Sequence, residues 1–127
     1  MSDHITLRIP GTTGHVGLAR ATASALAARL DFTYDRLTDL HIAIDEVCGR
    51  VLATSDPPAR HLELTFEPLE TGLRISVKGD GSLKPGAQFL NSWSKIILDS
   101  VVRDLEIRHE DGGPVSASFV LARETGE

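Results

Sequence analysis

Two helical patterns follow one another in the first half of the sequence, with no strand pattern between them. Apolar residues recur at spacings of three and four from Val16 to Leu30, and again from Leu37 to Val51. This spacing places apolar side chains on one face of a helix, which then packs against a core. A doubly wound parallel sheet requires helices that alternate with strands, so two successive helices favour an α+β fold.

The residues that flank these patterns predict where the two helices begin and end. Thr12 or Thr13 precedes the first helix, and Thr33 precedes the second. A threonine hydroxyl in that position accepts a hydrogen bond from an unpaired N–H of the first turn. The second helix is expected to end before residues 55–58, Ser-Asp-Pro-Pro, because proline has no N–H to donate and restricts the residue before it.

Alternating polar and apolar residues predict strands in the rest of the sequence. One hairpin turn is expected at residues 70–72, Glu-Thr-Gly, and another at residues 111–114, Asp-Gly-Gly-Pro. The predicted strands cover residues 4–9, 62–66, 73–77, 105–108 and 115–121.

A third helix is expected from about residue 87 to about residue 103, because apolar residues recur there at every fourth position. The predicted order is therefore β-α-α-β-β-α-β-β, and helices grouped in this way fit a two-layer α+β sandwich. A length of 127 residues suits one domain that spans residues 1–127. The apolar stripe of the third helix consists of Phe89, Trp93, Ile97 and Val101.

Composition and charge exclude several classes of function. The sequence has 13 basic and 18 acidic residues, a net charge of −5, which argues against a nucleic-acid-binding surface and a polybasic membrane patch. A single cysteine, Cys48, excludes an internal disulfide framework and a multi-cysteine zinc site. No apolar run approaches the roughly 18 residues of a membrane span, and the first residues lack the form of a signal peptide. A soluble, cytoplasmic protein is expected.

The polar face of the second helix holds the first candidate residues for chemistry. Glu46 and Arg50 lie four residues apart on that face, where a Glu–Arg pair stabilises a helix by about 0.2–0.5 kcal/mol. A solvated face with such a pair is the interpretation that the spacing favours. Cys48 is typical of a small buried residue, since no histidine is placed locally to activate it. Metal-ligand spacing is absent from the five histidines, His4, His15, His41, His61 and His109.

Two further features are weak signals on their own. Residues 79–82, Gly-Asp-Gly-Ser, follow a predicted strand, where a glycine-rich turn can cradle a phosphate, but they match neither a P-loop nor a dinucleotide-binding motif. A plain loop is therefore favoured. Arg20 lies beside the apolar stripe of the first helix, which is typical of a surface arginine, although arginine is also enriched where proteins meet.

Three segments taken together resemble the bacterial anti-sigma factor/serine-protein kinase family, a branch of the GHKL ATPase superfamily. They are residues 18–22 (LARAT), 40–50 (LHIAIDEVCGR) and 73–81 (LRISVKGDG), which occur in the order and at the spacing of the family. The resemblance implies a GHKL-type mixed sheet with helices on one face. It also implies contact with a sigma factor through Arg20 and a homodimer that forms through the sheet side.

The sequence departs from the family pattern at three places that contact different parts of ATP. Where the helix box of the family has a Mg²⁺-binding asparagine, this sequence has Arg50, which carries only donors and cannot ligate Mg²⁺. Where the strand box has an adenine-binding aspartate, it has Gly79; Asp80 would reach that site only through a register change, since it is expected on the opposite face. Residues 91–94 replace a Gly-x-Gly lid, and Trp93 is expected to obstruct a phosphate loop.

These departures decide the function that the resemblance implies. Glu46 remains as the only candidate base, within a degenerate nucleotide box of Glu46, Arg50, Gly79 and Gly81, and no metal or cofactor is expected. The expected function is an anti-sigma factor that sequesters an alternative sigma factor and is released by an anti-anti-sigma protein of the STAS type. The alternatives are a serine-protein kinase that uses ATP and Mg²⁺, and a non-catalytic scaffold or dimerisation module. Arg50, with a Ser-Trp pair in place of the lid, resembles an actinobacterial branch of the family.

Overall fold

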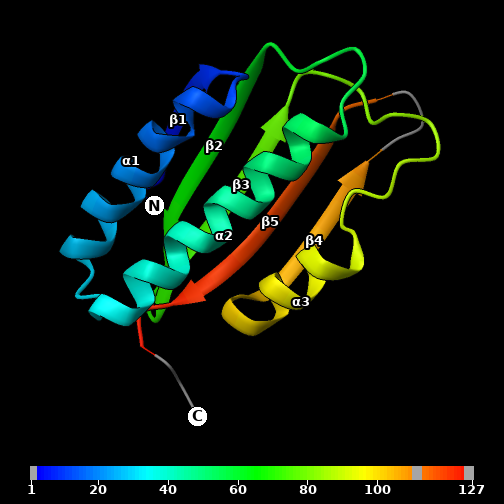
Figure 1. The fold of residues 1–127 in the computed structure, drawn as a ribbon. Helices are drawn as coiled ribbons and strands as arrows, with labels where there is room; N and C mark the ends of the chain where they lie inside the picture. The colour runs from blue at the N-terminus through cyan, green and yellow to red at the C-terminus, as the bar shows by residue number, and fades with distance from the viewer. Residues whose placement is uncertain (1–2, 110–112, 125–127) are drawn as a thin grey trace.

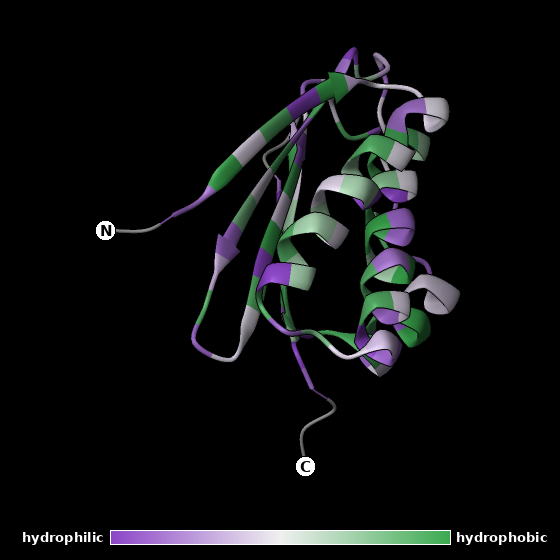
Figure 2. Cartoon of the chain, turned by 90° about the vertical axis from the view of Figure 1, so that its left-hand side faces the viewer, coloured by the Kyte–Doolittle hydropathy of each residue, from purple (hydrophilic) through white to green (hydrophobic). Residues whose placement is uncertain are grey.

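Three helices lie on one face of a five-stranded sheet in the computed structural model, which describes residues 3–109 and 113–124 (Figure 1). Figure 2 shows the helices on one side of the sheet and the other side uncovered. The predicted β-α-α-β-β-α-β-β order and the two-layer α+β sandwich are confirmed. The elements are β1 (Ile5–Pro10), a 3-10 turn (Thr13–His15), α1 (Val16–Arg29), α2 (Tyr34–Ala53), β2 (His61–Pro68), β3 (Gly72–Gly79), α3 (Ser92–Val101), β4 (Arg103–His109) and β5 (Val115–Ala122).

The strand order of the sheet is β1-β2-β3-β5-β4, and each neighbouring pair of these described strands is antiparallel. The mixed sheet that the resemblance implies is therefore wrong. For β2 and β3 the connection requires this direction, because the two strands form the predicted hairpin and a short turn can join only antiparallel strands. Leu64 lies opposite Val77, and Phe66 lies opposite Ile75, so alternate residues of the hairpin face the helices and form the core.

The helix α2 begins and ends as predicted. The Thr33 hydroxyl accepts a hydrogen bond from the backbone N–H of Arg36 at 3.3 Å, and the apolar stripe from Leu40 to Val51 is buried against the sheet. The predicted cap of the first helix is wrong, because the Thr12 hydroxyl lies 2.7 Å from His15 Nδ1 and a 3-10 turn precedes α1.

The helix α3 is shorter than predicted and faces the core with other residues. It begins at Ser92 because the Asn91 side chain caps it, accepting a hydrogen bond from the backbone N–H of Ser94 at 2.8 Å. Ser94 and Leu98 are the residues of α3 that point into the interior, whereas Trp93 is 69% exposed. The predicted stripe is therefore wrong at Trp93, since the helix does not continue back to Phe89, which packs into the core from the preceding loop.

The last two strands follow the prediction with small shifts. β4 begins at Arg103, two residues earlier than expected, and its pairing with β5 is irregular between Arg103 and Glu106. Half of the turn predicted at residues 111–114, namely residues 111 and 112, lies outside the described residues, although His109 pairs with Val115 on either side of it. Among the described helices, none combines the length and the apolar character needed to cross a bilayer.

Candidate functional site

Glu46 and Arg50 lie one turn apart on the side of α2 that faces α3. The contact predicted between their side chains does not form. Glu46 Oε2 accepts a hydrogen bond from Ser94 Oγ at 2.5 Å. Arg50 donates from Nε to the carbonyl oxygen of Phe89 at 2.5 Å and from Nη2 to that of Gln88 at 2.8 Å. No ion pair among the described residues joins Glu46 to Arg50, so the predicted helical pair is wrong. Glu46 instead binds Ser94 on α3, and Arg50 binds two carbonyl oxygens of the loop before α3.

The contact between Glu46 and Ser94 has a structural explanation. Ser94 is only 1% exposed, and a buried hydroxyl requires a hydrogen-bond partner. The carboxylate of Glu46 meets this hydroxyl in the first turn of α3, where the positive end of the helix dipole favours a negative charge. Glu46, the candidate base, therefore already accepts a hydrogen bond from a serine of its own chain.

Gly79 and Gly81 lie where neighbouring atoms leave no space for a side chain. A Cβ on Gly79 would lie 2.7 Å from Val51 Cγ1, inside the core side of the sheet. A Cβ on Gly81 would lie 2.5 Å from the carbonyl oxygen of Pro57. Both glycines thus allow the end of β3 and the loop after it to pack closely against α2 and residues 57–59, in agreement with the plain-loop interpretation.

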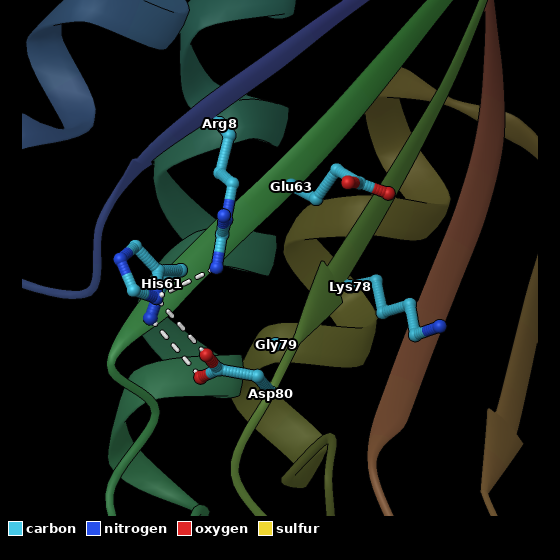
Figure 3. A pocket seen from close by; sticks show the side chains of 6 residues that line it. All are labelled: Arg8, His61, Glu63, Lys78, Gly79 and Asp80. Atoms are coloured by element: carbon cyan, nitrogen blue, oxygen red, sulfur yellow. Dashed lines mark hydrogen bonds and ion pairs between the residues drawn. The ribbon is translucent and has the colours of Figure 1, made fainter.

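Asp80 points to the opposite, uncovered face of the sheet, as its register predicts. It lines a cavity of about 200 Å³ there (Figure 3). Its carboxylate accepts hydrogen bonds from the backbone N–H groups of Arg60 (2.7 Å) and His61 (3.0 Å). The hydrogen bond from the His61 backbone, with help from the His61 ring at 3.1 Å, lowers the pKa of Asp80 to about 2. Asp80 is therefore engaged away from the helices. The other residues that line this cavity are Arg8, Glu63, Lys78 and Gly79.

Arg20 is a surface arginine with a partner inside the chain. Its Nη1 atom lies 2.5 Å from Oδ1 of Asp45 on α2, and its side chain remains 38% exposed. One turn further along α1, Ser24 Oγ lies 2.6 Å from Nε2 of His41 on α2. These two polar contacts join α1 to α2 at the surface. The sequence pattern indicated the position of Arg20 but not its pairing with Asp45, which lies 25 residues away.

The side chain of Trp93 is exposed, whereas that of Cys48 is buried. The side chain of Trp93 lies at the surface, and its predicted obstruction of a phosphate loop stays a prediction. Cys48 is fully buried, as predicted, and burial, together with the charge of Asp45, raises the pKa of its thiol to about 12. A thiol with that pKa is not a nucleophile at neutral pH. Within residues 3–109 and 113–124, no group of three or more His, Cys, Asp or Glu side chains is placed to hold a metal ion.

Sequence reasoning missed Arg36 and Ser94, which both hold α3 in place. Arg36 is buried, and it donates to the carbonyl oxygens of Ala122 (2.9 Å) and Val101 (3.0 Å) and pairs with Asp39 at 2.7 Å. An arginine in the first turn of a helix normally points to solvent, so the local pattern carried no signal for the role of Arg36.

The sequence comparisons find relatives but no family model that matches. The chain is 33% identical over 81 residues to the serine-protein kinase RsbW of Bacillus velezensis, and the aligned segment covers 62% of this chain and 51% of that protein. It is 24% identical over 146 aligned positions to the serine-protein kinase RsbW of Bacillus cereus, and this alignment covers 98% of this chain and 89% of that protein. The chain spans about half the length of the curated relatives that it matches at 30–33% identity.

A structural comparison agrees with the sequence relatives. The crystal structure of the RsbU and RsbW domains of Rv1364c from Mycobacterium tuberculosis matches 93% of this chain and 32% of that chain, with a TM-score of 0.66 at 17% identity. A match at this identity shows that the fold is shared. Taken with the relatives, it agrees with the resemblance that the three motif segments carry: the chain is similar in sequence to RsbW serine-protein kinases of Bacillus and shares the fold of an RsbW domain.

Proposed function

We propose that the chain is an anti-sigma factor that works through binding alone. It sequesters an alternative sigma factor, keeps it from RNA polymerase, and releases it when an anti-anti-sigma protein of the STAS type competes. In this proposal the protein acts in the cytoplasm as a single domain, as a homodimer formed through the uncovered face of the sheet, and belongs to an actinobacterial branch of its family. Arg20 on α1 contacts the sigma factor.

The observation that carries the proposal is that Glu46 and Arg50 both bind their own chain. A base in a kinase must reach the hydroxyl of a substrate, whereas Glu46 accepts a hydrogen bond from Ser94, which is buried. A Mg²⁺ site needs oxygen ligands. Arg50 instead brings a guanidinium, and its donors are used by the carbonyl oxygens of Gln88 and Phe89.

The surroundings of Gly79 also do not fit a nucleotide. An adenine needs an acceptor at the end of β3, but a side chain on Gly79 would collide with Val51, whose Cγ1 would lie 2.7 Å from the new Cβ. Asp80, the adjacent carboxylate, is directed to the other face and is already hydrogen-bonded. The described residues therefore do not fit Mg-ATP, and no catalytic step through it is proposed.

A serine-protein kinase is the second candidate function. The relatives are named serine-protein kinases, and Glu46 contacts a serine hydroxyl, which is the contact that a general base would make. Nucleotide binding separates the two candidates, because the kinase requires ATP and the binding protein does not.

Calorimetric titration of the intact chain with Mg-ATP tests the proposal. We expect no saturable heat with nucleotide up to millimolar concentrations, because donor atoms occupy the metal position and Val51 fills the space beside Gly79. A thermal melt with and without millimolar Mg-ATP is the parallel measurement, since a ligand that binds only the folded state raises the Tm. A dissociation constant in the micromolar range would contradict the proposal and favour the kinase.

Substitution of Arg20 tests the proposed sigma-factor contact. Arg20→Ala is expected to weaken binding of the cognate alternative sigma factor at least about tenfold, because an arginine truncated at an interface leaves a partner carboxylate unpaired. The Tm should change by only a few degrees, since the pair with Asp45 is solvent-exposed. Arg29→Ala, an exposed arginine at the end of the same helix, is the matched control. Wild-type affinity of Arg20→Ala for each alternative sigma factor of the host would place the contact elsewhere.

A further inference from the structure

One face of α2 holds the segment of residues 84–101, here called the strap, at successive turns of the helix. The strap consists of a loop and α3, and it runs antiparallel to α2. Anchors on α2 recur at positions 46, 50 and 54, a spacing of four that keeps them on one face. The contacts are Lys84 N to Thr54 O (2.7 Å), Arg50 to the carbonyl oxygens of Gln88 (2.8 Å) and Phe89 (2.5 Å), and Ser94 Oγ to Glu46 Oε2 (2.5 Å).

The C-terminal end of the strap is anchored in the same way. Arg36 donates from Nη2 to the carbonyl oxygen of Val101, the last residue of α3, at 3.0 Å. The last carbonyl groups of a helix lack partners within it and attract a positive charge, so this contact satisfies the end of α3. The strap is thus held at both ends and twice between them.

Arg50 is the anchor of the part of the strap that has no regular structure. Residues 85–91 are a loop, in which backbone carbonyl groups depend on side chains or water for hydrogen bonds. The planar guanidinium of Arg50 reaches two successive carbonyl oxygens with two nitrogen atoms, which a lysine ammonium cannot reproduce. The same contact keeps Phe89, which is 6% exposed, inserted in the core.

We propose that Arg50 is the latch of a built-in closure, which holds the strap against α2 through the carbonyl oxygens of Gln88 and Phe89. This device is independent of the identity of the sigma factor and goes beyond the proposed function. Loss of the latch should free the loop and loosen the first turn of α3, while the sheet, which does not depend on Arg50, stays closed. Arg50 in this role is a positioning residue.

Hydrogen exchange measured by mass spectrometry on the intact chain tests the latch. In Arg50→Ala, we expect amides of residues 86–94 to exchange at least about tenfold faster than in the wild type, with amides of β2 and β3 unchanged, because local opening exposes only the strap. Arg50→Lys should give an intermediate rate, since it keeps the charge but lacks the planar fork that binds both carbonyl oxygens. Arg29→Ala, which is exposed at the end of α1, is the control and should exchange like the wild type.

Trp93 provides a second readout, because it is the only tryptophan of the chain and lies on α3. Its fluorescence anisotropy should decay faster in Arg50→Ala than in Arg29→Ala if the strap moves independently of the domain. Wild-type exchange of residues 86–94 in Arg50→Ala would overturn the proposal. If Arg50→Ala unfolds as a whole, Arg50→Lys decides: faster exchange confined to the strap supports the latch, and uniform acceleration that includes β2 and β3 overturns it.

Discussion

Gly79→Asp, which introduces the aspartate typical of the family at this position, is expected to destabilise the protein by about 3 kcal/mol or more and to create no nucleotide site. The new Cβ would lie 2.7 Å from Val51 Cγ1 and 3.4 Å from the Cβ of Ala59, and overpacking of a filled core costs about 1–3 kcal/mol. The carboxylate would also be buried without a partner, which adds about 1–3 kcal/mol or more.

Urea denaturation of three variants measures this effect. Gly79→Ala carries only the steric part and should lose less stability than Gly79→Asp. Gly49→Ala is the matched control on α2, because a Cβ there meets nothing within 4 Å. Alanine is the better helix former by about 1 kcal/mol, so this control should be slightly stabilised. Stability of Gly79→Asp close to that of the wild type, together with binding of Mg-ATP, would show that α2 can move away from the end of β3.

Arg36→Ala is expected to cost about 3 kcal/mol or more of stability. The substitution removes hydrogen bonds from a charged donor to two carbonyl oxygens, those of Val101 and Ala122, each worth about 1.5–3 kcal/mol. It also leaves Asp39 without its ion-pair partner. That carboxylate is 26% exposed, so water offsets part of this last contribution.

The unfolding midpoints of Arg36→Ala, Arg36→Lys and Arg29→Ala separate the role of the guanidinium from a general effect of charge. Arg36→Lys retains the charge but cannot make three directed contacts, so an intermediate stability is expected. Arg29→Ala changes an exposed side chain and should stay within about 0.5 kcal/mol of the wild type. A loss below about 0.5 kcal/mol in Arg36→Ala would mean that water replaces these hydrogen bonds in full.

Periodic spacing of apolar residues predicted the helices and strands of this fold well wherever those residues are buried in the core. The stripe from Leu40 to Val51 and the alternation in β2 and β3 lie in the core as expected, because a period of 3.6 or 2 residues places side chains on one face whatever packs against it. The third helix was less predictable. Its start depends on the Asn91 cap, and the inward residues are Ser94 and Leu98, so a spacing of four through Trp93 selected the wrong face.

The site shows the same division between local and non-local information. The spacing of Glu46 and Arg50 indicated a pair, but each side chain takes a partner that lies 38 to 48 residues away in the sequence. A local helical pair contributes only about 0.2–0.5 kcal/mol, whereas hydrogen bonds from a charged group to otherwise unpaired acceptors contribute about 1.5–3 kcal/mol. The non-local contacts therefore prevail.

The sequence by itself determined the order of the elements, the core faces of α2, β2 and β3, and the resemblance to a family, since these depend on periodicity and on the order of motifs. The tertiary structure alone decided that Val51 fills the space beside Gly79, that Asp45 holds Arg20, and that Arg50 binds the loop before α3. Each of these facts joins residues from different elements. Which carbonyl group lacks a partner, or which space is already occupied, is set only when those elements pack together.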